Sequence, residues 1–192
     1  MNQDVKGEIM IDLNELYVRH YCPRDCNPFM NFCRLPKKDA FALARKMAIK
    51  HPNIPPFSRF HSFESYYDRR MAIEDLLYDS FVSLGGKPKE RHPIYFILHK
   101  SKALVDYMGE STLYEIKIAD VPADSISFTL DDSVVAYKRD GKFTMYTKET
   151  LQSHLGSYNG TIDEYISKLN EQYYCIEAHI WNDDILTSMK LM

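Results

Sequence analysis

Hydrophobic and polar residues alternate most regularly in Tyr173–Asp184, near the C-terminus. A period of two residues predicts a β-strand whose side chains point alternately to two faces. One face would carry Tyr174, Ile176, Ala178 and Ile180. The other would carry Cys175, Glu177, His179 and Trp181. Because the second face combines a carboxylate, an imidazole and an indole, we expect it to form the floor of a site. A solvent-facing edge with ordinary polar residues is the alternative.

The remaining patterns predict further strands and helices. Alternation or short apolar runs predict strands at Leu13–Tyr21, Phe57–Phe63, Ile94–Leu98, Leu113–Ile118 and Ile126–Leu130. Helical periodicity with start signals predicts helices from Pro36, from about Ser65, and after Ser101, Thr147 and Thr161. His51-Pro52 and Gly85-Gly86 should end the first two. Between Val134–Lys138 and Phe143–Thr147, Asp140-Gly141 is a strong hairpin signal.

Strands and helices do not alternate regularly along the chain, which argues against a doubly wound parallel sheet. The sequence therefore predicts a single α+β domain over residues 1–192, with mixed or antiparallel sheets and a helix-rich N-terminal half.

Composition narrows the function classes. The chain has a net charge of −3 and a pI near 6.2, which argues against a general binder of nucleic acid or membrane surfaces. A local basic patch stays open, so nucleic acid is not excluded as a partner. The N-terminus lacks the pattern of a secretory signal, and no apolar run approaches the roughly 20 residues that span a bilayer. We expect a cytoplasmic protein without a membrane partner.

Three of the four cysteines, Cys22, Cys26 and Cys33, cluster just after His20. The spacing C-x3-C-x6-C matches none of the usual paired zinc knuckles. Reduced structural thiols are the expected state, and we expect no metal site.

Glu177 and His179 are the candidate catalytic residues. A carboxylate on a strand can stabilise an oxocarbenium-like transition state, and an imidazole two residues later can bind substrate or relay a proton. In the predicted first strand, Arg19 and His20 point to opposite faces, so only one of them can face a cleft with Glu177.

The segment Ser58–Arg70 is the richest in basic, hydroxyl and aromatic side chains. Arg59, Arg69 and Arg70 add positive charge, and Tyr66 and Tyr67 add ring faces. Ser62 or Ser65 would lie near a helix N-terminus, where free N–H groups attract phosphate. A purely structural alternative pairs Arg70 with Glu74 one helical turn later and places the tyrosines in the core.

Asp131 and Asp132 follow a predicted strand, where they can bind a metal ion or turn the chain; we favour the turn. No Ser-His-Asp arrangement, phosphate loop, H-E-x-x-H motif or dinucleotide-binding fingerprint is present in the sequence.

Several blocks of the chain resemble a group of uncharacterised bacterial proteins, and that resemblance implies no activity. The blocks are Leu35–Phe41, Ser58–Arg70, Leu77–Pro93, Ile126–Ser133 and Tyr174–Leu186.

The order of elements also resembles the ADP-ribosyltransferase fold, particularly its DNA-targeting toxin branch. There an opening strand carries a basic residue, an aromatic and basic segment precedes a helix, and a late strand delivers a Glu. The resemblance assigns these roles to Arg19 or His20, to Tyr66 or Tyr67, and to Glu177. The chain departs from that family in lacking a Ser-Thr-Ser strand and in having His179 where an acidic or amide residue often pairs with the Glu.

The resemblance implies an NAD-dependent ADP-ribosyltransferase-like protein, with NAD as substrate and Glu177 as the catalytic carboxylate. Arg19, His20, Arg59, Tyr66, Tyr67 and Arg70 would then bind NAD. The acceptor is not readable from the sequence. A non-catalytic protein of a phage or toxin/defence system, binding a partner through its Tyr-rich surface, is the alternative.

Overall fold

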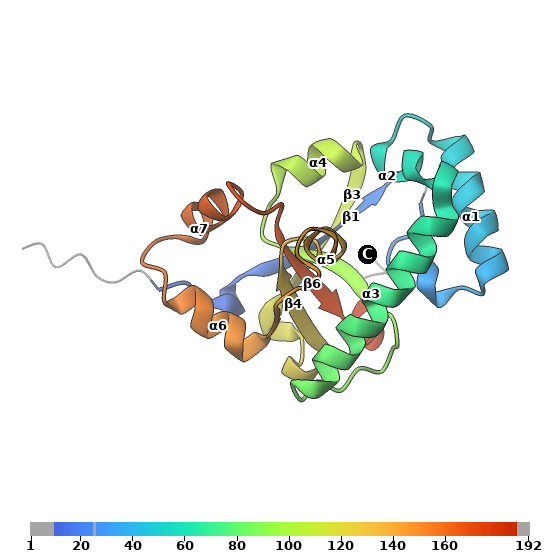
Figure 1. The fold of residues 1–192 in the computed structure, drawn as a ribbon. Coiled ribbons are helices and arrows are strands. Elements are labelled where there is room, and N and C mark those ends of the chain that lie inside the picture. Colours follow the sequence, from blue (N-terminus) through green and yellow to red (C-terminus); the bar gives the residue numbers. More distant parts are fainter. Residues whose placement is uncertain (1–9, 25, 188–192) are drawn as a thin grey trace, which may run out of the picture.

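The strand that carries Glu177 lies near the middle of a six-stranded sheet. A computed structural model describes residues 10–24 and 26–187. Within them, the sheet has the order β3-β1-β2-β6-β4-β5, and all of its strand pairs are antiparallel (Figure 1). The strands are β1 (Tyr17–Pro23), β2 (Ile94–Leu98), β3 (Ser111–Lys117), β4 (Ile126–Leu130), β5 (Met145–Thr147) and β6 (Ile176–Ile180).

Helices cover the sheet in separate groups. Figure 1 shows α1, α2 and α3 gathered on one side of the molecule, with α6 and α7 at the opposite side. The helices are α1 (Lys37–Lys50), α2 (Pro55–Ser58), α3 (Phe63–Ser83), α4 (Lys102–Met108), α5 (Ser133–Asp140), α6 (Lys148–Gly156), α7 (Ile162–Leu169) and α8 (Asp184–Thr187). The predicted α+β class with an antiparallel sheet is confirmed.

One face of the sheet is apolar and packs into the main core. Val18, Phe96, Phe128 and Ala178 lie on it, one from each of the four inner strands, and all are at most 2% exposed. Leucines and isoleucines of α6 and α7 complete this cluster. Burial of such side chains contributes about 1.5–3 kcal/mol each, so this face supplies much of the stability.

The other face of the sheet is polar, although it is also buried. Cross-strand pairing places Arg19, Ile97, Glu177 and Thr129 in one row across β1, β2, β6 and β4. The next row places Tyr95, His179 and Ser127 opposite one another. The predicted division of the closing strand into an apolar and a polar face is therefore confirmed.

Helix α3 packs over the polar face with two apolar clusters. Ile73, Leu77 and Phe81 pack with Trp181 at the end of β6. Nearer its N-terminus, Tyr67 packs with the aromatic residues around α2 and with small side chains of α1. Those small residues are Ala40, Ala44 and Ala48, whose i, i+4 spacing places them on one face of α1.

The strand predicted at Phe57–Phe63 is wrong. The chain there forms α2 and a 3-10 turn, Arg59–Ser62, that leads directly into α3. Pro55 stands in the first turn of α2. Phe57, Phe60 and Phe63 recur every three residues and are all buried in the α1–α3 cluster, so helical spacing decides the structure.

The hairpin predicted around Asp140-Gly141 is also wrong. Val134–Lys138 lies in α5, because the Asp132 side chain accepts hydrogen bonds from the N–H groups of Val134 and Val135. Gly141 has φ of 69° and ends the helix in the left-handed conformation. The Asp-Gly pair thus terminates a helix, and β5 pairs with β4 instead.

Most other predicted boundaries are confirmed, except that Leu13–Glu15 of the predicted first strand forms a 3-10 turn and β1 begins at Tyr17. Helix α1 ends at His51, and Gly85 adopts φ of 90° after α3. Ser101, Thr147 and Thr161 each cap the helix that follows. None of the helices in the described ranges is long and apolar enough to cross a membrane. The predicted domain covers residues 1–192, of which residues 1–9, 25 and 188–192 lie outside the described residues. The N-terminal stretch assessed for a secretory signal includes residues 1–9 and therefore also lies partly outside them.

Candidate functional site

A cavity of about 300 Å³ lies between the polar face of the sheet and the helical layer formed by α2, α3 and α4. Seven of the eight predicted site residues line it: Arg19, His20, Arg59, Tyr66, Tyr67, Arg70 and Glu177. The eighth, His179, does not. The lining also includes residues that sequence reasoning did not select, notably Tyr95, Tyr107 and Asp132.

Glu177 forms part of the cavity wall and is 6% exposed. Its Oε2 accepts a hydrogen bond from the backbone N–H of Ser133 at 3.0 Å. The same oxygen lies 3.0 Å from Nε2 of the His179 imidazole. Oε1 accepts no hydrogen bond from the described part of the chain. One oxygen is therefore held by the protein, and the other is available to a ligand.

The surroundings of Glu177 favour its charged form. Burial alone would raise the pKa of this carboxyl, but the hydrogen bond from His179, the charge of Arg70 and the Ser133 N–H outweigh burial and hold the pKa below its usual value. Ser133 is the first residue of α5, and a helix N-terminus stabilises an anion.

His179 lies behind Glu177, away from the cavity. It is fully buried, and its Nδ1 contacts Ser127 Oγ at 3.1 Å. Because it does not line the cavity, it cannot contact a ligand there. The predicted role of His179 in binding substrate is therefore not supported by its position.

Of the two neighbours on β1, Arg19 and not His20 lies on the face of the sheet that carries Glu177. His20 Nδ1 bonds the carbonyl of Tyr95 at 2.8 Å, and Nε2 accepts from the N–H of Phe29 at 3.3 Å, so both ring nitrogens are occupied. Arg19 shares the face of Glu177 two strands away, about 10 Å between backbones. Its Nε lies 2.7 Å from Glu115, while Nη1 is buried without a hydrogen-bond partner among the described residues.

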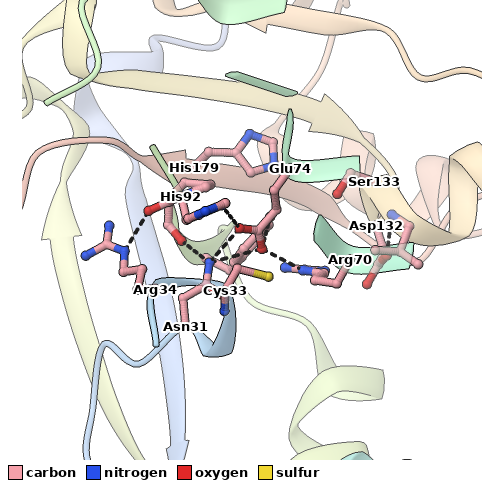
Figure 2. A network of polar contacts seen from close by, with 12 residues as sticks. Asn31, Cys33, Arg34, Arg70, Glu74, His92, Asp132, Ser133 and His179 are labelled. Carbon is pink, nitrogen blue, oxygen red and sulfur yellow. Dashed lines mark hydrogen bonds and ion pairs between the residues drawn. The ribbon is translucent and has the colours of Figure 1, made fainter. Parts of the chain in front are cut away.

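Arg70 is held by a buried network that centres on Glu74, which is 0% exposed (Figure 2). Glu74 accepts hydrogen bonds from Arg70 Nε, from the Asn31 amide and from the Tyr95 hydroxyl, all at 2.9–3.0 Å. His92 Nδ1 lies 2.9 Å from the same carboxylate. The predicted Arg70–Glu74 pair exists, but it is a buried pair and not an exposed helical one.

The guanidinium of Arg70 lies over the ring of Tyr95, 3.8 Å from its centre. Only Nε of Arg70 bonds Glu74, and the terminal nitrogens make no hydrogen bond within the described ranges. Figure 2 shows Arg70 between the Glu74 network and the Asp132–Ser133 end of α5. The network therefore fixes a cation in the cavity wall with free donors.

Arg59 and two tyrosines form the outer rim of the cavity. The Arg59 guanidinium lies 5.4 Å from the ring of Tyr66 and 5.6 Å from the ring of Tyr107, and it also bonds the Tyr107 hydroxyl. Arg59 is exposed. By contrast, Ser62 and Ser65 line a separate open hollow, so the predicted phosphate position at that helix start does not belong to this cavity.

Asp132 adds a second carboxylate to the cavity wall. Burial and the charge of Glu177 raise its pKa, although it caps α5. Asp131 is fully buried with φ of 78°, and it accepts hydrogen bonds from Arg139 Nη1 and the N–H of Tyr174. Both residues therefore organise the chain between β4 and α5, in line with the predicted turn.

Cys22, Cys26 and Cys33 do not form a group of potential metal ligands among the described residues. Cys22 is buried, and burial raises the pKa of its thiol to about 11. Cys33 instead lies with Glu74 and His92, the one group of three potential metal ligands found in the described ranges. Burial and the charge of Glu74 raise the pKa of Cys33 as well. Arg70 and Tyr95 donate to Oε1 of Glu74, whereas Oε2 accepts from Asn31 and faces His92.

We expect a chelator to leave the melting temperature unchanged, because hydrogen bonds from Asn31, Arg70 and Tyr95 already hold the Glu74 carboxylate without a metal ion. Differential scanning calorimetry with and without EDTA, beside elemental analysis of the purified protein, measures this. A stoichiometric transition metal together with a large loss of melting temperature would show that the cluster is a metal centre.

Comparisons of the chain with protein-family models, with curated proteins and with solved structures found no match.

Proposed function

We propose that the protein is an NAD-dependent ADP-ribosyltransferase with an ADP-ribosyltransferase-like fold, and that NAD binds in the Glu177 cavity. The observation that carries this proposal is the position of Glu177. It is a buried, ionised carboxylate with one free oxygen, and it lines the same cavity as arginines with free donors.

A carboxylate in this position suits cleavage of a nicotinamide–ribose bond. As nicotinamide leaves, positive charge develops on the ribose ring, and a fixed negative charge stabilises it most effectively in a site of low dielectric. The free Oε1 of Glu177 can accept a hydrogen bond from a ribose hydroxyl and so orient the ring. The acceptor then attacks the ribose carbon that nicotinamide has left.

The cations suit the diphosphate of NAD. Arg19 carries a buried Nη1 without a partner in the described chain, and Arg70 has free terminal nitrogens. Arginine is well suited to phosphate, because its planar fork of N–H donors matches phosphate oxygens. Arg59 adds an exposed charge at the rim.

The tyrosines supply surfaces for the flat rings of a dinucleotide. Tyr21, Tyr66, Tyr95 and Tyr107 line the cavity. Aromatic faces bind planar heterocycles by stacking. A second cavity of about 340 Å³ lies next to the first and shares five lining residues with it: His20, Tyr21, Met30, Phe32 and Met108.

The proposal is tested by thermal stability in NAD and by release of nicotinamide. At 100 times Kd, one bound NAD adds about 2.7 kcal/mol of stability, which for a chain of this size raises the melting temperature by roughly 5–10 °C. No shift at millimolar NAD, with no nicotinamide released in the presence of cell extract as a source of acceptors, would favour a non-catalytic binding protein.

Arg59→Ala is expected to weaken NAD binding by about 1.5–3 kcal/mol, the range for a hydrogen bond to a charged group. Stability should change little, because Arg59 is exposed. Isothermal titration of NAD gives the affinity, and urea unfolding gives the stability.

Arg69→Ala is the matched control, since Arg69 is an exposed arginine of α3 that does not line the cavity. Equal affinity in the Arg59 and Arg69 variants would mean that the rim arginine has no part in binding the phosphates.

A further inference from the structure

The fully buried side of the site contains a chain of polar side chains that ends on Glu177. Trp181 Nε1 lies 2.9 Å from Ser127 Oγ, Ser127 Oγ lies 3.1 Å from His179 Nδ1, and His179 Nε2 lies 3.0 Å from Glu177 Oε2. Ser127, His179 and Trp181 are each 0% exposed. A row of polar groups in such a place costs free energy unless every donor finds an acceptor.

The direction of each hydrogen bond follows from the chemistry of the groups. The indole N–H of Trp181 can only donate, so Ser127 Oγ is its acceptor. The Ser127 hydroxyl hydrogen then has only one acceptor among the described residues, which is His179 Nδ1. Nδ1 must therefore lack a proton. A neutral imidazole carries its proton on Nε2, and Nε2 faces the Glu177 carboxylate.

We propose that Trp181, Ser127 and His179 form a one-way hydrogen-bond chain that fixes His179 as the neutral Nε2–H tautomer, so that His179 positions Glu177. The role of this chain in catalysis rests on the proposed function; the chain itself does not. His179 is thus a positioning residue, since it does not line the cavity. Its N–H and the Ser133 N–H hold Oε2 from two directions and leave Oε1 to the substrate.

An ion pair between protonated His179 and Glu177 is the competing arrangement. It would place a second N–H on Nδ1, facing Ser127 Oγ. The Ser127 hydroxyl would then receive two donors and leave its own hydrogen without an acceptor in the described chain. Because an unpaired buried donor is costly, the one-way chain is favoured.

Several other titratable or charged groups face Glu177 and must stay unchanged in any comparison. They are Cys175 on β6, Asp132 at the start of α5, Arg70 on α3 and Tyr95 on β2. A substitution at Ser127 removes none of these groups, so it isolates the chain from the rest of the site.

The test is the tautomer of His179 in the ligand-free protein, read at pH 7 from the ring nitrogens in a long-range ¹H–¹⁵N correlation spectrum. His179 should show a protonated Nε2 and an unprotonated Nδ1. His20 is an internal reference with the opposite pattern, because its Nδ1 must donate to the Tyr95 carbonyl. Two protonated nitrogens on His179, or a protonated Nδ1 alone, would overturn the proposal whatever the protein does to NAD.

A second readout tests the catalytic consequence. Ser127→Ala should lower kcat for nicotinamide release by roughly 10- to 100-fold, the scale of effect when a reacting group is misplaced, and leave KM nearly unchanged. Ser127→Thr keeps the hydroxyl and should restore most of kcat. An unchanged kcat in a folded Ser127→Ala protein would remove the chain from catalysis. If the wild type releases no nicotinamide, the proposed function fails, and the tautomer alone still decides whether the chain exists.

Discussion

Glu177→Gln is expected to lower nicotinamide release from NAD by at least 100- to 1000-fold, the scale seen when one preorganised electrostatic group is removed from a transition-state site. The variant keeps the shape of the side chain, and its amide oxygen can still accept from the N–H of Ser133. It lacks the charge that would stabilise the developing ribosyl cation. Substrate binding should be retained, because the cations and rings of the cavity are untouched.

Chromatographic quantification of nicotinamide measures this effect, and far-ultraviolet circular dichroism checks the fold. Glu110→Gln is a suitable control, since Glu110 is exposed and pairs with Arg24 away from the cavity. A Glu177→Gln protein that releases nicotinamide at the wild-type rate would eliminate Glu177 as the catalytic carboxylate.

Glu74→Gln should destabilise the protein by about 3–5 kcal/mol, because it leaves the charge of Arg70 without its buried partner. Glu74 is 0% exposed, and the side chain of Arg70 is 13% exposed. The stability measured by urea unfolding should fall by that amount. Since Arg70 lies over Tyr95 in the cavity wall, affinity for NAD should also fall.

Asp75→Asn provides the matched control on the same helix. Asp75 pairs with Arg91, and each side chain of that pair is 48% exposed, so its loss should cost no more than about 1 kcal/mol. Equal destabilisation of the two variants would show that the buried network contributes no more to the free energy of unfolding than an exposed ion pair does.

The Glu74 network also makes the stability of the protein depend on pH. Burial opposes ionisation of Glu74, but the close approach of His92 Nδ1, the charge of Arg70 and the Asn31 amide prevail and lower its pKa from the ordinary 4.5. A lowered pKa in the folded state means that the unfolded state binds the proton first. The stabilisation is complete above pH 4.5 and is lost as the pH falls through the lower folded-state pKa. Glu74→Gln should therefore show a weaker loss of stability in acid than the wild type.

The closing strand could be read from the sequence because its alternation is strict. Each residue of Ile176–Ile180 lies on the predicted face, and Glu177 on the polar face lines the cavity. The sequence also selected seven residues of the cavity wall in advance, and four of them, Arg59, Tyr66, Tyr67 and Arg70, lie in the single segment Ser58–Arg70. These features are local, and local periodicity is what a sequence reports best.

Other features depend on contacts between distant segments. Tyr95 lies within an apolar run, Ile94–Leu98, and its hydroxyl gains importance only because Glu74 is next to it in space. In the sequence, Glu74 is recognisable only as the partner of Arg70 in a helical ion pair. Its contacts with Asn31 and His92 come from distant segments and appear only in the structure. The choice between Arg19 and His20 likewise needed the strand pairing, because alternation alone does not say which face meets the core.

The two wrong elements have a common cause. Phe57–Phe63 and Val134–Lys138 are short and rich in aromatic or β-branched residues, which favour strands. In the structure, helix signals at their ends prevail, namely Pro55 before the first and Asp132 and Gly141 around the second. For these runs of five to seven residues, signals that start or end a helix therefore outweigh intrinsic propensity.

A titration of NAD into ¹⁵N-labelled Glu177→Gln protein, followed by amide chemical shifts, tests most directly whether the cavity is a nucleotide site. The variant should bind NAD without consuming it. We expect the largest shift changes at amides that surround the cavity, such as those of Tyr66, Tyr95 and Ser133, with saturation at millimolar NAD or below. No shift changes at millimolar NAD, or changes confined to a distant surface such as the Lys89–Asp184 ion pair, would contradict the assignment of this cavity to NAD.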